Sequence, residues 1–155
     1  MSTEDVFERN DVMIPQRVSL ITIGANDMPS LRSFYQRLGW SETSISSDNY
    51  AVFATAGVLL SLYPIEDLLR DLGKDRSELT NGFKGMTFAI NVDRREEVDY
   101  TIGKIRTAGG QIIRLPHDAF WGGRIAYFMD PEENIWEVAW NPTALFDERG
   151  AMISF

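Results

Sequence analysis

Residues 122–142 read GGRIAYFMDPEENIWEVAWNP. Two apolar runs, RIAYFM and IWEVAW, flank the segment DPEEN, whose Asp, Pro and Asn are typical of tight turns. Glu137 is the one charged residue of the second run, and alternation along a strand places it on the face opposite Trp136 and Val138. The stretch therefore predicts an antiparallel hairpin with one bulky apolar face and one face that carries a carboxylate.

The N-terminal half carries a strand, a helix and another hairpin, in that order. The run VSLITIG (18–24) predicts a strand, and Asn26 and Asp27 behind it are candidate helix N-caps. The helix that follows shows one apolar stripe, formed by Leu31, Phe34, Tyr35 and Leu38. YAVFAT (50–55) and VLLSLY (58–63) then predict an antiparallel pair of strands.

The C-terminal half repeats this order of elements. GMTFAINV (85–92) predicts a strand, and the apolar positions Val98, Ile102 and Ile105 predict a helix, before QIIRL and the hairpin described above. The repetition predicts an α+β fold of two β-α-β-β-β modules. The expected parts are an N-terminal extension (1–14), a single domain (15–142) made of module one (15–64), a connector (65–83) and module two (84–142), and a C-terminal tail (143–155).

Composition narrows the classes of function. The chain has 155 residues, 15 Lys plus Arg against 23 Asp plus Glu, one histidine and no cysteine. It can therefore form no disulfide or thiolate site, and His117 alone cannot supply the imidazoles of common iron and zinc centres. The net charge of −8 disfavours nucleic acid and anionic membranes as partners. Because the start is acidic and no apolar run reaches the length of a spanning helix, we expect a cytoplasmic protein.

Two stretches carry a resemblance to a known family. ITIGANDMPSLRSFYQRLGW (21–40) and residues 122–142 are similar to segments of the vicinal oxygen chelate superfamily, which includes glyoxalase I, bleomycin resistance proteins and extradiol dioxygenases. The resemblance implies curved, mixed and mostly antiparallel sheets, with helices outside and a concave ligand cleft, in one glyoxalase-like domain. It also implies a homodimer.

Metal-binding members of that superfamily place ligands at four positions of the cleft floor. Carried over onto this chain, those positions hold Leu20, Leu60, Thr87 and Glu137. Leucine has no donor atom and threonine is a weak neutral ligand, whereas protein metal sites use three or more protein ligands. We therefore expect no metal and no other cofactor in the cleft.

Alternation along the predicted strands indicates which side chains face the cleft. It assigns Trp136 and Val138 to the helix side and leaves Glu137 as a single carboxylate on a largely apolar floor. The expected ligand-binding residues are Leu20, Thr22, Leu60, Leu62, Thr87, Ala89, Asn91, His117, Trp121, Arg124 and Glu137.

Several of these residues leave alternatives open. Glu137 acts as a general acid or base or binds a cation, or Arg124 neutralises it as the remnant of a metal site. His117, in the predicted loop PHDAFWGG, titrates above the cleft or is a solvated surface residue. Trp121 forms a wall or lid at the cleft mouth or packs against the hairpin.

The leading functional hypothesis is a protein similar to bleomycin resistance proteins, which binds a small, largely apolar or aromatic molecule in a metal-free cleft. The alternative is an enzyme, either a lyase or isomerase resembling glyoxalase I with Glu137 as the proton-transfer base, or a dioxygenase-like metal enzyme with unusual ligands. A third reading is that side chains close the cleft and the fold serves assembly. The sequence leaves open whether a reaction is catalysed.

Overall fold

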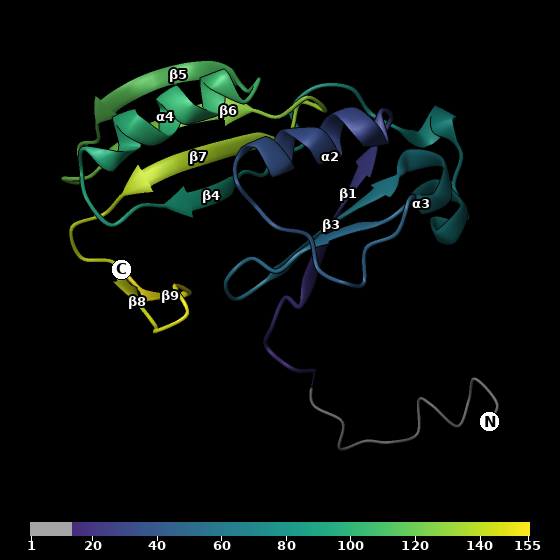
Figure 1. The fold of residues 1–155 in the computed structure, drawn as a ribbon, viewed down its shortest axis with the longest axis horizontal. Helices are drawn as coiled ribbons and strands as arrows, with labels where there is room; N and C mark the ends of the chain where they lie inside the picture. The colour runs from purple at the N-terminus through teal and green to yellow at the C-terminus, as the bar shows by residue number, and fades with distance from the viewer. Residues whose placement is uncertain (1–13) are drawn as a thin grey trace.

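The computed structural model of the chain describes residues 14–155. The expected N-terminal extension (1–14) lies outside the described residues, except for Ile14. Within the described part, three sheets, three α-helices and a short 3-10 helix follow one another as Figure 1 shows. The order of a strand, a helix and antiparallel strands occurs two times, which confirms the predicted α+β fold.

Module one forms a sheet in the strand order β1-β3-β2. Its elements are β1 (Leu20–Ala25), α2 (Met28–Arg37), β2 (Ala51–Phe53) and β3 (Leu59–Pro64). β1 runs parallel to β3, and β2 runs antiparallel to it. The polar segment before β2 adds only two isolated bridges, Glu42 with Phe53 and Ser47 with Tyr50, because it lacks the apolar alternation of a half-buried strand. Module one thus has one strand fewer than predicted.

Module two forms a four-stranded sheet in the order β4-β7-β6-β5. Its elements are β4 (Phe88–Asn91), α4 (Glu97–Thr107), β5 (Gln111–Asp118), β6 (Arg124–Met129) and β7 (Ile135–Trp140). β6 and β7 are the antiparallel hairpin predicted from residues 122–142. Asp130 closes its turn, because Oδ1 accepts from the backbone N–H groups of Glu132 and Asn134, each at 2.9 Å.

One hydrophobic core joins the two modules. Figure 1 shows α2 beside β7, although α2 belongs to the other module. Its Phe34 and Tyr35 are fully buried. The ring of Phe34 lies 6.3 Å from that of Phe128 on β6, and the ring of Tyr35 lies 6.0 Å from that of Trp136 on β7, measured between centroids. Helix α2 therefore packs against the sheet of module two and fixes the relative position of the modules.

The connector and the tail add short elements to this framework. They are α3 (Ile65–Leu72), the 3-10 helix η1 (Arg76–Glu78), β8 (Leu145–Phe146) and β9 (Met152–Ser154). β8 and β9 pair with each other as a separate two-stranded sheet. Across residues 14–155, no helix has the length and apolar character needed to cross a membrane.

Candidate functional site

Strand β7 places Glu137 on the face of the sheet that lies away from the core. Its neighbours Trp136 and Val138 are 5% and 0% exposed and pack in the core. Glu137 is half-buried and projects to the other face, since successive side chains of a strand alternate. This confirms the parity predicted for IWEVAW.

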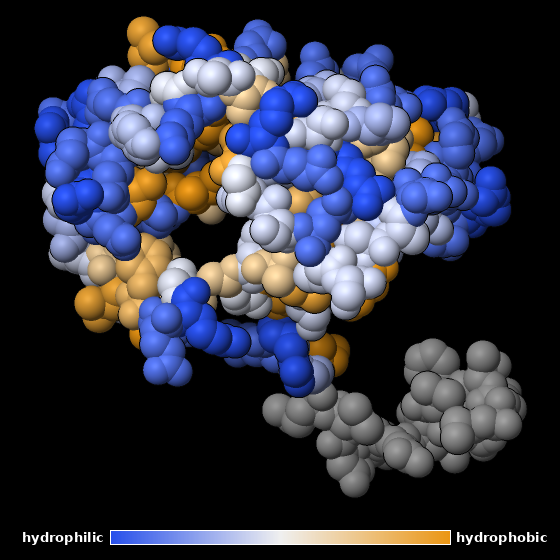
Figure 2. Space-filling model, viewed as in Figure 1, coloured by the Kyte–Doolittle hydropathy of each residue, from blue (hydrophilic) through white to orange (hydrophobic). Residues whose placement is uncertain are grey.

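Glu137 lines a cavity of about 570 Å³ on that face. The floor comes from β4 and β7, and the tail provides part of the cover. The lining residues are Ala89, Asn91, Trp121, Glu137, Ala139, Asn141, Thr143, Met152 and Phe155. Figure 2 shows the surface hollowed between the two halves of the molecule, with apolar side chains gathered along the lower left border. Within this lining, Glu137 is the one charged side chain.

Tyr127, on the neighbouring strand β6, holds the carboxylate of Glu137. Its hydroxyl donates a hydrogen bond to Oε2 of Glu137 at 2.5 Å. This hydrogen bond to Glu137 raises the pKa of Tyr127, and partial burial adds to the effect. Sequence analysis missed Tyr127 although a signal was present, because a hairpin closed by DPEEN sets Tyr127 directly opposite Glu137.

Gly123 seats the indole of Trp121 at the cavity. A Cβ atom on Gly123 would lie 2.0 Å from the Trp121 ring and 2.5 Å from the carbonyl oxygen of Trp140. The indole therefore packs directly on the Gly123 backbone, where no side chain fits. Gly122 supplies the left-handed residue of this turn, with φ of 98°. Trp121 forms a wall of the cavity and keeps 43% of its surface exposed.

The predicted contribution of β3 to the cleft floor is wrong by one residue. Leu60 and Leu62 are 4% and 0% exposed and belong to the hydrophobic core. The run LLSLYP is nearly continuous in apolar residues, so alternation gave little guidance there. Ser61 is the β3 residue that shares a face with Thr22, and their hydroxyl oxygens lie 2.6 Å apart.

The cavity divides the predicted ligand-binding residues into two groups. Ala89, Asn91, Trp121 and Glu137 line it, and all four belong to module two. Leu20, Thr22 and Thr87 do not appear in its lining. The structure therefore brings together four of the predicted residues of module two, and it leaves Thr87 and the predicted residues of module one outside this cavity.

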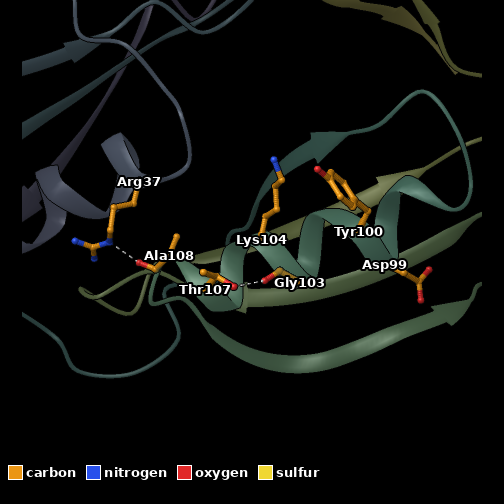
Figure 3. Close-up of a pocket in the computed structure, with 7 residues that line it drawn as sticks. All are labelled: Arg37, Asp99, Tyr100, Gly103, Lys104, Thr107 and Ala108. Carbon is orange, nitrogen blue, oxygen red and sulfur yellow. Dashed lines mark hydrogen bonds between the residues drawn. The ribbon is translucent and has the colours of Figure 1, made fainter.

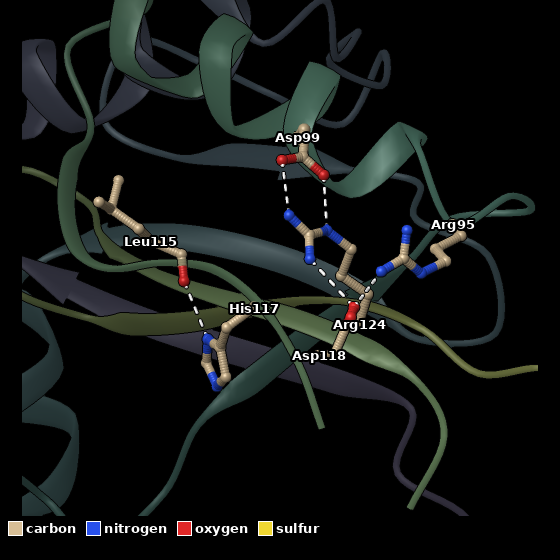
Figure 4. Close-up of polar contacts among 6 residues, drawn as sticks. All are labelled: Arg95, Asp99, Leu115, His117, Asp118 and Arg124. Atoms are coloured by element: carbon tan, nitrogen blue, oxygen red, sulfur yellow. Dashed lines mark hydrogen bonds and ion pairs between the residues drawn. The ribbon is translucent and has the colours of Figure 1, made fainter. Parts of the chain in front are cut away.

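Arg124 lies on the helix side of the sheet. Its guanidinium donates to both carboxylate oxygens of Asp99 on α4, at 2.7 and 2.9 Å, and to Asp118 on β5 at 3.0 Å (Figure 4). These hydrogen bonds raise the pKa of Arg124. Arg124 has the same strand parity as Phe128, which is buried in the core. The prediction that Arg124 binds a ligand in the cleft or neutralises Glu137 is therefore wrong.

His117 lies within β5 and not in the predicted loop. Its Nδ1 lies 2.9 Å from the carbonyl oxygen of Leu115. Its partner on β6 is Ile125, so His117 shares the face opposite Arg124, and Figure 4 shows the imidazole directed away from the Arg124 ion pairs. His117 is outside the lining of the cavity that contains Glu137.

A second hollow, of about 640 Å³, lies along the outer surface of α4 (Figure 3). Its lining residues are Arg37, Asp99, Tyr100, Gly103, Lys104, Thr107 and Ala108. The Lys104 ammonium lies 5.0 Å from the ring centroid of Tyr100, and Arg37 Nε donates to the carbonyl oxygen of Ala108 at 2.8 Å. The cationic groups here are engaged by neighbouring side chains and backbone. None of the predicted site residues lies in this hollow.

Comparison with known proteins assigns the chain to a family. The family model described as Glyoxalase/Bleomycin resistance protein/Dioxygenase superfamily matches residues 17–138. The chain belongs to this superfamily. The match extends over both modules and includes β4 and the part of β7 that carries Glu137.

Individual members of the superfamily are similar to the chain at modest identity. A glyoxalase-related enzyme from Fulvimarina pelagi shares 28% identity at a TM-score of 0.82, covering 91% of this chain and 99% of that one. A superfamily enzyme from Burkholderia phytofirmans PsJN shares 23% identity at a TM-score of 0.73, covering 80% and 98%, which shows the fold alone. The uncharacterized protein YraH of Bacillus subtilis (strain 168) is 26% identical over 124 residues, which make up 76% of this chain and 93% of YraH.

The metal site that the resemblance implies for the superfamily does not fit the residues of this cleft. Ser61 is the position of module one that corresponds to Glu137 in module two. Ser61 pairs with Thr22 on β1 as Glu137 pairs with Ala89 on β4. Ser61 is fully buried against Thr22, and Leu20 offers no donor atom. In the described part of the chain, no group of three His, Cys, Asp or Glu side chains could share a metal ion. Glu137 is left as a carboxylate that already accepts a hydrogen bond from a phenol.

Proposed function

We propose that the cavity beside β7 binds a small, largely apolar or aromatic molecule that presents a cationic or N–H donor group to Glu137. One observation carries the proposal: a single carboxylate lines a 570 Å³ cavity whose other walls include Trp121, Met152 and Phe155. Family membership supports only the fold on which the proposal rests, because one fold hosts many functions.

The apolar residues of the cavity and the carboxylate of Glu137 contribute to binding in different ways. Burying an apolar ligand face contributes about 25 cal/mol per Å², so contact with Trp121 and the tail supplies several kcal/mol over a small aromatic molecule. The carboxylate of Glu137 adds a charge-assisted hydrogen bond at one defined point of the floor. Apolar area therefore provides most of the affinity, and Glu137 provides the orientation.

A thermal-shift screen of arylalkylamines, which are cationic at neutral pH, and their uncharged isosteres tests the proposal. The amines are expected to stabilise the wild-type protein more than their isosteres, and Glu137→Gln is expected to abolish the difference. Glu96→Gln, which removes an exposed carboxylate near the start of α4, is the matched control and should bind as the wild type does. Equal stabilisation of wild type and Glu137→Gln by every hit would rule out the anchor role of Glu137.

A proton-transfer enzyme, of the lyase or isomerase type, is the second candidate function. The hydrogen bond from Tyr127 favours it, because an oriented carboxylate with a fixed second group is the arrangement a general base requires. Incorporation of deuterium from D₂O next to the carbonyl of a bound aromatic ketone, lost in Glu137→Gln, would establish this activity. Elemental analysis of protein purified without chelator tests the metal-enzyme alternative, since a stoichiometric metal that disappears in Glu137→Ala would establish it.

A further inference from the structure

The two carboxylate oxygens of Glu137 are not equivalent. Oε2 accepts the hydroxyl of Tyr127 at 2.5 Å, which is the short distance expected when a hydroxyl donates to a charged oxygen. The backbone sets this contact, because Tyr127 and Glu137 are directly paired in the β6–β7 ladder and their side chains share one face. One oxygen is thus engaged by the protein before any ligand enters.

Among the groups of the described residues that surround Glu137, the hydroxyl of Tyr127 is the one that forms a hydrogen bond with its carboxylate. On β5, Arg114 pairs with Tyr127, and its charge acts to lower the pKa of that phenol. His117, the other titratable residue on this face of β5, pairs with Ile125 one row away. On the remaining sides the cavity is lined by residues whose side chains do not titrate: Ala89, Asn91, Trp121, Ala139, Asn141, Thr143, Met152 and Phe155.

We propose that Tyr127 is a positioning residue that determines the class of cation the cleft accepts. Planar cations such as amidinium and guanidinium groups bind a carboxylate best when two parallel N–H donors reach both oxygens. The hydroxyl of Tyr127 already donates to Oε2 and takes up part of its accepting capacity, so Oε1 is the oxygen left fully open to a ligand, which suits the single-point contact of a compact ammonium group. The cleft therefore selects aromatic ammonium ligands over aromatic amidines. This inference rests on the proposed function of Glu137 as the ligand anchor.

Two aromatic cations of similar size test the selection. 1-Naphthylmethylamine offers an ammonium group and 1-naphthamidine offers a planar amidinium, and each carries one positive charge at neutral pH. Isothermal titration gives the dissociation constants for the wild type, Tyr127→Phe, Glu137→Gln and Tyr100→Phe. Tyr100 lies exposed on α4 in the other hollow, so Tyr100→Phe is the matched tyrosine control.

The ratio of the two dissociation constants is the decisive readout. The wild type and Tyr100→Phe should bind the amine more tightly. Tyr127→Phe frees Oε2 and should move the ratio about tenfold toward the amidine, as one additional charge-assisted hydrogen bond predicts. If Tyr127 only supported the fold, Tyr127→Phe would weaken the binding of both ligands by the same factor. The ratio would then stay unchanged, and this result would overturn the inference.

The outcomes separate this inference from the function on which it rests. If Glu137→Gln weakens both ligands but Tyr127→Phe leaves the ratio unchanged, the anchor stands and the positioning role is wrong. If neither cation binds the wild type, or Glu137→Gln binds both as well as the wild type does, the proposed function itself is wrong and this inference falls with it.

Discussion

The hydroxyl of Tyr35 on α2 donates a hydrogen bond of 2.5 Å to Oδ2 of Asp130 in the turn between β6 and β7. The same hydroxyl oxygen accepts from Trp136 Nε1 at 3.0 Å. Tyr35 is fully buried and Asp130 is 4% exposed. This contact joins the helix of module one to the hairpin that carries Glu137, so the position of the cavity floor depends on it.

Replacing Tyr35 by Phe removes a hydroxyl that serves two buried partners. Because Asp130 loses a donor and Trp136 loses its acceptor, we expect the free energy of unfolding to fall by roughly 1–3 kcal/mol. Urea denaturation measures the change. Tyr100→Phe, at an exposed position, is the control and should stay within about 0.5 kcal/mol of the wild type. Equal stabilities of Tyr35→Phe and the wild type would contradict a stabilising role for the contact.

Asp130 gives the stability a defined dependence on pH. Burial raises its pKa above the ordinary value of 3.8, although the hydrogen bonds from Tyr35 and Asn134 act in the opposite direction. The folded state then binds this proton more readily than the unfolded state, so the stabilising contribution is complete below pH 3.8 and is lost as the pH rises through the raised pKa. Asp130→Asn lacks this contribution. We expect the unfolding free energy of wild type minus that of Asp130→Asn to increase as the pH falls from neutral toward 3.8. Urea titrations across this pH range check the sign, and a decrease would be inconsistent with a raised pKa.

Two glycines should respond in opposite ways to alanine. At Gly123 the added Cβ would collide with the ring of Trp121 and the carbonyl of Trp140, so Gly123→Ala should displace the indole and destabilise the fold by roughly 1–3 kcal/mol. At Gly103, inside α4, nothing lies within 4 Å, so Gly103→Ala should stabilise by about 0.5–1 kcal/mol through its higher helix propensity. Thermal denaturation and tryptophan fluorescence follow both changes. A Gly123→Ala protein with native stability and an unchanged emission spectrum would disprove the close packing of Trp121.

The tail and the β2–β3 turn approach closely enough to be cross-linked. A Cβ atom at Gly57 would lie 3.4 Å from Cβ of Ala151, close to the separation found in disulfides, although the φ of 87° at Gly57 means that a cysteine there is strained. Because the chain has no cysteine, the double variant Gly57→Cys, Ala151→Cys contains a single possible intramolecular pair. Thiol titration after mild oxidation should show both thiols consumed in the monomer. The two single-cysteine variants are the controls, and free thiols persisting in the monomeric double variant would show that the tail does not rest against module one.

Arg124→Gln should affect stability but not ligand binding. Hydrogen bonds from Arg124 lower the pKa of Asp99, and those from Arg95 and then Arg124 lower the pKa of Asp118. Carboxylates with lowered pKa stabilise the fold above pH 3.8 and lose this effect as the pH falls through the lowered values. The variant should therefore be less stable at neutral pH and approach the wild type in acid. Its dissociation constant for 1-naphthylmethylamine should equal that of the wild type, and a marked change would place Arg124 in the cleft after all.

Much of the fold could be predicted from the sequence, and the candidate site only in part. The face that Glu137 occupies followed from IWEVAW, where bulky apolar residues alternate with small or polar ones. The same reasoning failed for Leu60 and Leu62, because in VLLSLY only Ser61 breaks the apolar run. For Arg124, strand parity with Phe128 gives the side of the sheet, but its ion pair with Asp99 on α4 joins separate segments of the chain and no local pattern records it.

The sequence by itself determined the order of the elements, the turn that closes β6 and β7, and the face of β7 on which Glu137 lies. These features depend on residues that are close to one another in the sequence. Only the tertiary structure decided that Ser61 and not Leu60 shares a face with Thr22, that the tail covers part of the cavity and that α2 packs against the second sheet. Those relationships depend on the register between strands and on packing between segments that are far apart in the chain. An apolar residue at one position indicates that the position is buried, but it does not indicate which segment covers it.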